Sequence, residues 1–192
     1  MSEDPVTLFQ GLLAEARTRE SFDATACALA TAAPDAAPSV RVVLLKDAGP
    51  EGFAFFTNYG SRKARELDAN PQAALSFHWP VLGVQVRVEG RTQRVPREES
   101  VAYFSTRPRE SQLGAWASSQ SARIGSRDEL LARYREQEAR FAGGEVPCPP
   151  FWGGYRLSPL RVEIWRNREF RLHERTLYTR GREGWTTEVL CP

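Results

Sequence analysis

The sequence predicts a mainly β protein with interspersed helices (α+β), whose strands form a β-barrel or a strongly curved sheet. Short β-branched and apolar segments bounded by turns recur along the chain, and helical periodicity is confined to a few segments. The strands do not alternate regularly with helices, as a βαβ fold would require. The length of 192 residues and the absence of a low-complexity linker predict one domain spanning residues 1–192.

In the first half of the chain, a helix is expected to begin at Pro5, with Asp4 as its cap. Residues 24–33 are Ala-rich and fit either a helix or a buried strand. Residues 39–46 (SVRVVLLK) and 53–57 (FAFFT) are expected to pair as a hairpin, and residues 73–79 and 84–93 as another. In the last of these strands, Val84, Val86 and Val88 should face one side of the sheet and the intervening polar residues the other.

In the second half, helices are expected over residues 96–106 and from the cap Ser126 to Gly143. Strands are expected at residues 155–165, 169–178 and 185–190.

Composition excludes several classes of protein. The 26 basic residues are nearly matched by 24 acidic ones, so the net charge of +2 does not indicate a nucleic-acid partner. Three cysteines without a CxxC pair and only two histidines indicate neither a disulfide framework nor a metal site. The N-terminus lacks an apolar signal core and no long apolar segment follows, so we expect a cytoplasmic protein without a membrane partner.

The segment Gly60-Ser61-Arg62-Lys63 is a candidate anion site. It ends a strand, turns at a glycine, and places two cations in the first turn of a helix, where an anion is favoured. A solvated basic turn explains the pattern equally well. Neither GxxxxGK nor GxGxxG occurs in the chain, so a mononucleotide phosphate fits better than a dinucleotide.

Two further segments combine cations with other polar groups. On a strand, Arg171, His173 and Arg175 would share one face, where they form either a ligand-binding face or an ordinary solvated one. Tyr103 and Arg107 are four residues apart on an expected helix and suit a second phosphate, although a surface tyrosine–arginine stack is an equal alternative.

Together these segments closely resemble the pyridoxamine 5′-phosphate oxidase family, from about Asp4 to Pro192. The resemblance is carried by DPVTLF, RVVLLK, TNYGSRKARELDANP, QVRVEGR, YFSTRPRESQLGAWASSQS, FWGGYRL and RLHER. It implies an FMN-binding split β-barrel that forms a homodimer, with FMN held where the subunits meet. The cofactor-binding residues that it implies are Arg41, Val42, Val43, Leu44, Leu45, Lys46, Phe56, Thr57, Arg62, Lys63, Gln85, Gln120, Ser121, Trp165 and Arg175.

The resemblance also implies a reaction, in which pyridoxamine or pyridoxine 5′-phosphate is oxidised to pyridoxal 5′-phosphate and O2 is reduced to H2O2. In this reaction a hydride passes from the substrate carbon next to the ring to the flavin. Arg171 and His173 are the expected catalytic residues, and histidine has a suitable ordinary pKa near ~6.5 for assisting proton movement. The substrate-binding residues that the resemblance implies are Lys46, Tyr103, Arg107, Ser111, Arg171 and His173.

This sequence departs from the family pattern at three places. The N-terminal arm that often precedes the first helix is expected to be absent or truncated, Phe56 stands where tyrosine is common, and Val84 where many relatives have arginine. Two alternatives stay open: a related split-barrel flavin oxidase with another substrate, such as one of the phenazine-biosynthesis branch, and a non-catalytic module that binds FMN or RNA.

Overall fold

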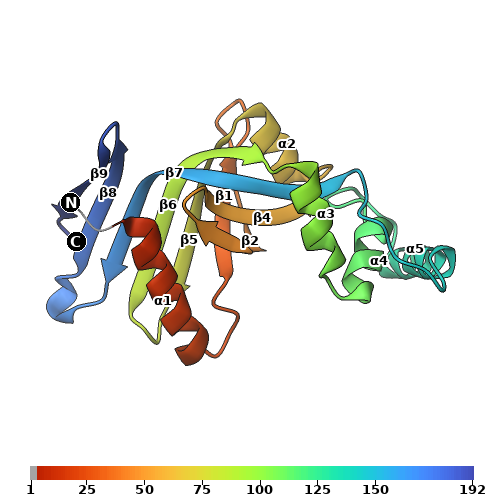
Figure 1. Cartoon of the computed structure of the whole chain (residues 1–192), viewed down its shortest axis with the longest axis horizontal. Coiled ribbons are helices and arrows are strands. Elements are labelled where there is room, and N and C mark those ends of the chain that lie inside the picture. Colours follow the sequence, from red (N-terminus) through yellow and green to blue (C-terminus); the bar gives the residue numbers. More distant parts are fainter. Residues whose placement is uncertain (1–3) are drawn as a thin grey trace.

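The computed structural model describes residues 4–192 and contains one nine-stranded antiparallel sheet with five α-helices (Figure 1). The strand order is β2-β1-β5-β6-β7-β4-β3, and β8 joins β7 to β9. The strands are β1 Ala26–Ala32, β2 Pro38–Leu44, β3 Asp47–Gly49, β4 Gly52–Asn58, β5 Gln72–Trp79, β6 Val84–Arg94, β7 Trp152–Arg166, β8 Glu174–Gly181 and β9 Gly184–Leu190. The helices are α1 Pro5–Arg19, α2 Arg62–Ala69, α3 Arg97–Ser105, α4 Arg109–Ala117 and α5 Arg127–Arg140.

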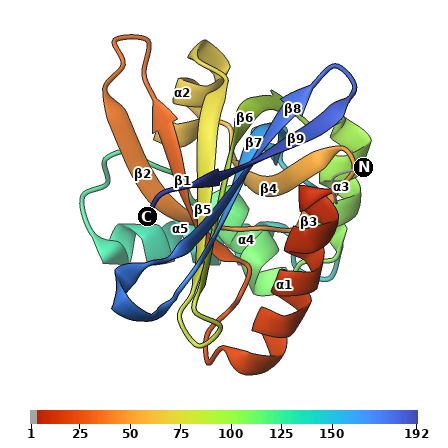
Figure 2. The ribbon, with the colours of Figure 1, turned by 90° about the vertical axis from the view of Figure 1, so that its left-hand side faces the viewer.

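The long strand β7 connects the two ends of the molecule. One of its edges pairs with β4 near Trp152 and with β8 near Trp165, while its other edge pairs with β6. The β6–β7 register shifts between Glu89 and Gly90, where a Cβ on Gly90 would lie 2.1 Å from the Ser158 carbonyl oxygen. Glycine therefore permits the close approach at which the sheet bends. Figure 2 shows the curled sheet that results.

Helix α1 supplies the centre of the core. Asp4 caps it by accepting hydrogen bonds from the amides of Val6 and Thr7, as the Asp-Pro pair predicted. Phe9 is fully buried, and its ring centroid lies 4.9 Å from that of Phe53 on β4 and 4.8 Å from that of Phe77 on β5. One helical side chain thus joins strands that are not neighbours in the sheet.

Most strands form where alternation predicted them. Val84, Val86 and Val88 are buried on β6, whereas Gln85 and Arg87 are half-exposed. β5 and β6 form the expected hairpin. The Ala-rich residues 24–33 are resolved in favour of a strand, because β1 pairs with β2 on one side and with β5 on the other.

The expected hairpin between residues 39–46 and 53–57 is wrong. β2 pairs along its whole length with β1, and β4 pairs instead with β7 and with the short strand β3. Only the residues nearest the turn form a hairpin, as β3 and β4. In this turn Gly52 has a φ of 123°, a conformation that favours glycine. The chain that follows β2 therefore pairs with β4 only from Lys46 onward, where the Lys46 amide donates to the Ala54 carbonyl.

The expected strand over residues 169–178 is wrong in its first half. Residues Glu169–Arg171 form a 3-10 turn, and β8 begins at Glu174. Phe170 and Arg171 have positive φ values of 56° and 61°, so Arg171, His173 and Arg175 do not share a strand face. Phe170 and Leu172 are 87% and 68% exposed, and neither forms the core face that strict alternation predicted.

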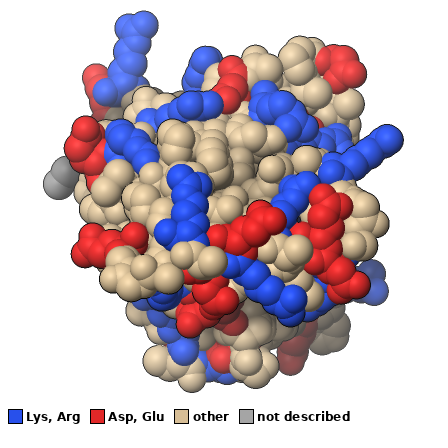
Figure 3. All heavy atoms as spheres, turned by 90° about the vertical axis from the view of Figure 1, so that its right-hand side faces the viewer, with Lys and Arg blue, Asp and Glu red and all other residues tan. Residues whose placement is uncertain are grey.

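On the surface that faces the viewer in Figure 3, basic and acidic side chains are interspersed. None of the helices within residues 4–192 combines the length and apolar character needed to cross a membrane. Positive charge that no carboxylate of the described residues balances lies instead inside the pocket described below.

Because Phe9 fills the space between two strands, Phe9→Ala should lower the free energy of unfolding by about 3–5 kcal/mol. Phe22, which is 44% exposed, provides a matched control, and Phe22→Ala should cost less than about 1 kcal/mol. Urea denaturation at one protein concentration measures both values. Equal losses in the two variants would show that Phe9 does not anchor the core.

Candidate active site

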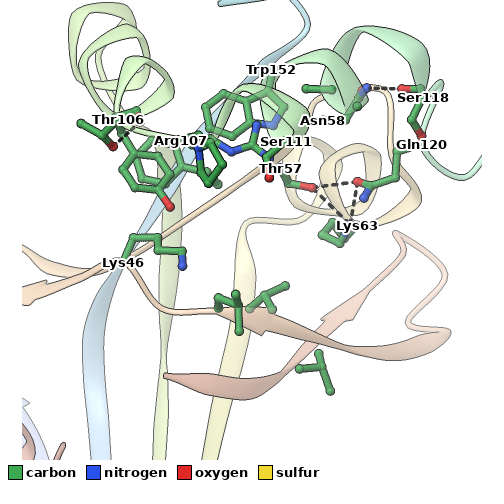
Figure 4. Close-up of a pocket in the computed structure, with 18 residues that line it drawn as sticks. Lys46, Thr57, Asn58, Lys63, Thr106, Arg107, Ser111, Ser118, Gln120 and Trp152 are labelled. Atoms are coloured by element: carbon green, nitrogen blue, oxygen red, sulfur yellow. Dashed lines mark hydrogen bonds between the residues drawn. The ribbon is translucent and has the colours of Figure 1, made fainter. Parts of the chain in front are cut away.

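A pocket with a volume of about 640 Å³ lies between β2, β4, α2, α3 and α4 (Figure 4). Such a volume suits a cofactor or small-molecule ligand. Most of the site residues expected from the sequence line it. They are Val42, Val43, Leu44, Lys46, Phe56, Thr57, Lys63, Tyr103, Arg107, Ser111 and Gln120.

Lys63 is a buried cation in this pocket. Ser61 caps α2 as predicted, and the first turn places the Lys63 ammonium against the Thr57 hydroxyl at 3.2 Å and the Gln120 amide oxygen at 3.0 Å (Figure 4). None of its hydrogen-bond partners within residues 4–192 is a carboxylate. Burial, aided by the positive charge of Arg41, lowers the pKa of Lys63. An anion bound here would relieve that cost.

Arg107 is a second cation without a carboxylate. Its guanidinium carbon lies 4.7 Å from the Trp152 ring centroid, and its Nη1 is buried with no hydrogen-bond partner in the described protein. Burial lowers the pKa of Arg107. An unsatisfied buried donor is costly, so this nitrogen indicates a missing acceptor.

Aromatic rings position Arg107 and Tyr103. Phe56 on β4 stacks on Tyr103 with ring centroids 4.2 Å apart, and on Trp152 at 5.4 Å. Arg107 lies just beyond the end of α3, yet it lines the same pocket as Tyr103. Phe56, which replaces the tyrosine common in the family, therefore contributes a stacking surface.

Arg41 lies on the other face of β2 from Val42 and does not line the pocket. Its guanidinium contacts Glu66 on α2 at 3.2 Å, together with the hydroxyls of Thr31 and Ser39. Burial alone would raise the pKa of Glu66, but hydrogen bonds from Ser39, Thr31 and the guanidiniums of Arg62 and Arg41 outweigh it and lower the pKa to about 2. This carboxylate ties α2 to β1 and β2.

Three other expected cofactor residues lie at the margin of the pocket. Leu45 is buried behind it, Arg62 forms an ion pair with Glu66 at 2.7 Å, and the Ser121 hydroxyl accepts a hydrogen bond from the Arg62 amide at 3.2 Å. The sequence did not single out several residues that line the pocket. These are Asn58, Thr106, Pro108, Gly114, Ala115, Ser118 and Trp152. Each of them lies within one of the motifs that carry the family resemblance, TNYGSRKARELDANP, YFSTRPRESQLGAWASSQS or FWGGYRL, and these motifs were the available signal.

The remaining expected residues form a second group. Gln85, Trp165 and Arg175 are direct neighbours across β6, β7 and β8. The ring of His173 lies 4.5 Å from that of Trp165, and Arg171 occupies the preceding turn. Glu163 is buried beneath them and binds Arg175 at 2.9 Å.

The two groups lie at opposite ends of β7, near Trp152 and near Trp165 (Figure 1). At about 3.3 Å per strand residue, that stretch spans roughly 40 Å. Within one chain, therefore, Arg171 and His173 cannot reach a ligand held by Lys63 and Arg107.

The hydrogen bonding of His173 limits its chemistry. Its Nδ1 accepts a hydrogen bond from the Arg168 amide at 3.2 Å. In the neutral ring the proton is therefore assigned to Nε2, which is then the donor of the ring. Among residues 4–192, no cluster of three or more His, Cys, Asp or Glu side chains could hold a metal ion.

Comparison with known proteins identifies the family. A model described as pyridoxamine 5′-phosphate oxidase matches residues 14–140, and one described as the pyridoxine 5′-phosphate oxidase C-terminal dimerisation region matches residues 152–192. The chain belongs to the pyridoxamine 5′-phosphate oxidase family. The dimerisation region coincides with β7–β9, which carry the second group of residues.

Similar proteins cover the whole chain. The pyridoxine/pyridoxamine 5′-phosphate oxidase of Anaeromyxobacter dehalogenans is 58% identical over 98% of this chain and 96% of its own length. That of Zymomonas mobilis is 51% identical over 100% of both. The crystal structure of PhzG from Burkholderia lata 383 with tetrahydrophenazine-1-carboxylic acid has a TM-score of 0.94 and 32% identity, and covers 100% of this chain and 94% of that one. The split-barrel fold expected from the sequence is confirmed.

The low pKa of Glu66 predicts a specific dependence of stability on pH. In the unfolded protein this carboxyl group has an ordinary pKa of ~4.3. Because its pKa is lower in the folded protein, the group stabilises the fold above its unfolded pKa, and this contribution is lost as pH falls toward 2. Between pH 5 and 3, the free energy of unfolding should therefore fall less in Glu66→Gln than in the wild type. The difference between the two should be about the contribution of one carboxyl group. The exposed Glu98→Gln should follow the wild type. Parallel curves for Glu66→Gln and wild type would refute the assignment.

Proposed function

We propose that the chain is a homodimeric, FMN-dependent oxidase that converts pyridoxamine or pyridoxine 5′-phosphate to pyridoxal 5′-phosphate in the pocket between β2, β4 and α2–α4. The observation that carries the proposal is a pair of cations, the buried Lys63 and the half-buried Arg107 with its buried Nη1, which have no carboxylate partners within residues 4–192. Two phosphorylated ligands, cofactor and substrate, supply the two anions that these cations lack. The full-length similarity to pyridoxine/pyridoxamine 5′-phosphate oxidases supports the same choice.

The residues around α2 fit the phosphate of FMN. Lys63 supplies a buried charge, and it lies in the first turn of α2, where the helix dipole favours an anion. Thr57 and Gln120, which already bond to Lys63, are positioned to share that phosphate. Val42, Val43 and Leu44 line the pocket beside them and offer backbone groups and an apolar surface to the flavin ring.

The residues at the end of α3 fit the phosphate of the substrate. Arg107 Nη1 provides the unpartnered donor, and Tyr103, Ser111 and Lys46 line the same part of the pocket. Stacking on Phe56 and Trp152 holds Tyr103 and Arg107 in place before a ligand arrives. Little side-chain entropy then remains to be lost on binding.

Bound FMN would supply the oxidising chemistry, as acceptor of a hydride from the substrate carbon next to the ring, with O2 as the final oxidant and H2O2 as its product. For the amine substrate, water would then hydrolyse the imine to the aldehyde and release ammonia. The protein binds, orients and shields the substrate. Arg171 and His173 orient its reacting end, and Nε2–H of His173 donates a hydrogen bond there. The hydrogen bond from the Arg168 amide to Nδ1 fixes the ring, so that Nε2 is the atom of His173 that faces the substrate.

A second copy of the chain completes the site. Because β7 separates the two groups of residues, Arg171 and His173 serve the pocket of the partner. Val40 and Val42 are each 69% exposed on the face of β2 beside the pocket, and this apolar surface is suited to burial against the partner. The match to the dimerisation region over residues 152–192 supports the same arrangement. We also propose a single domain, because one sheet includes all nine strands.

The reaction itself is tested by adding pyridoxamine 5′-phosphate to the FMN-loaded protein without oxygen. We expect loss of the yellow flavin colour, its return on admission of air, and formation of pyridoxal 5′-phosphate. A protein that takes up no FMN would contradict the cofactor assignment. A yellow protein that is bleached only by a phenazine precursor would contradict the proposed substrate. It would assign the protein to the phenazine-biosynthesis branch instead.

A further inference from the structure

Arg156 on β7 is a buried cation outside the pocket. Its side chain is 10% exposed and contacts carboxylates from separate segments. Nη1 lies 2.6 Å from Asp47 on β3, Nη2 lies 2.7 Å from Glu99 on α3, and Nε lies 3.8 Å from Glu51 in the β3–β4 turn. Burial opposes its charge, but hydrogen bonds and attraction from Asp47 and Glu99 hold the pKa of Arg156 above its ordinary value.

The sheet register explains how one guanidinium reaches β3 and α3. Arg156 pairs with Ala54 on β4, and Ala54 in turn pairs with Asp47 on β3, so the three residues lie in one row across the sheet. Residues paired in this way project from the same face. The small, fully buried Ala54 leaves a path over which the arginine extends to Asp47.

The two carboxylates bound most tightly are directly linked to pocket residues. Asp47 follows Lys46 in the chain, and Glu99 precedes Tyr103 by one helical turn on α3. Lys46 and the Thr106–Arg107 segment face each other across the pocket (Figure 4). A single guanidinium thus connects the backbone segments that carry both sides of the proposed phosphate site.

We propose that Arg156 is a positioning residue for the substrate phosphate: it fixes Lys46 relative to α3 and neutralises Asp47 and Glu99 beside an anion site. The inference rests on the proposed function. Without Arg156, the carboxylates of Asp47, Glu51 and Glu99 would be left uncompensated next to the pocket and would repel a phosphate. The FMN phosphate, bound near α2, should be little affected.

The test is steady-state kinetics of FMN-loaded Arg156→Gln with pyridoxamine 5′-phosphate. We expect KM to rise about tenfold while kcat changes by less than about twofold, because uniform binding is lost rather than chemistry. The increase should be larger at low ionic strength, where repulsion is less screened. Arg156→Lys, which keeps the charge, should recover most of the KM, and the dissociation constant of FMN, measured by fluorescence quenching, should stay unchanged.

Two further variants separate positioning from general destabilisation. Arg161→Gln removes an exposed arginine of β7, the strand that carries Arg156, which pairs with Glu89 on β6, and it should leave KM at the wild-type value. Glu99→Ala should raise KM less than Arg156→Gln, and the double variant should be no worse than Arg156→Gln alone, because the two residues act as one unit. Other contacts hold α3 to β7 in these variants, including the bond from the Gly154 amide to Ser100.

A wild-type KM in Arg156→Gln, or equal changes in KM and FMN affinity, would overturn the inference. Absence of wild-type turnover with pyridoxamine 5′-phosphate would instead contradict the proposed function. The two failures are therefore distinguishable.

Discussion

The length of β7 is the constraint on which the organisation of the site depends. This single strand of 15 residues pairs with β6 along one edge and with β4 and then β8 along the other, so it holds the sheet together. It also places Trp152 and Trp165, each beside a different group of polar residues, roughly 40 Å apart. Under the proposed function, the strand that stabilises the fold of one chain also keeps its two groups of residues apart, so that dimer formation becomes part of the proposed catalysis.

The cations of the structure also fall into two kinds, those with carboxylate partners and those without. Among residues 4–192, the buried cation Arg156 has carboxylate partners in Asp47 and Glu99, whereas the buried Lys63 and the half-buried Arg107 have none. The difference separates structural cations from those available to ligands. It also explains why phosphorylated molecules suit the pocket: an uncharged ligand would leave both cations desolvated without compensation.

Sequence patterns predicted the structural features that depend on residues close together in the chain. The Asp4 and Ser61 caps and the alternation on β6 were predicted correctly from neighbouring residues. The turn at Phe170 and Arg171 was not predicted, because apolar and polar residues alternate there as they do in a strand. Neither residue type indicates a positive φ. The pairing of β2 with β1 and the division of the site into two groups depend on contacts distant in sequence. Only the resemblance to the family indicated which distant residues serve one ligand.

The most direct test of shared sites is complementation between two inactive variants. Arg107→Ala removes a residue of the pocket, and His173→Ala removes one from the far end of β7. Each variant alone should be inactive, but mixed dimers regain one intact site when the partner supplies His173. Random assortment of equal amounts should therefore restore about a quarter of wild-type activity. If the mixture stays as inactive as its components while mixed dimers are demonstrably present, the two residues serve the same subunit, and the division of the site along β7 is wrong.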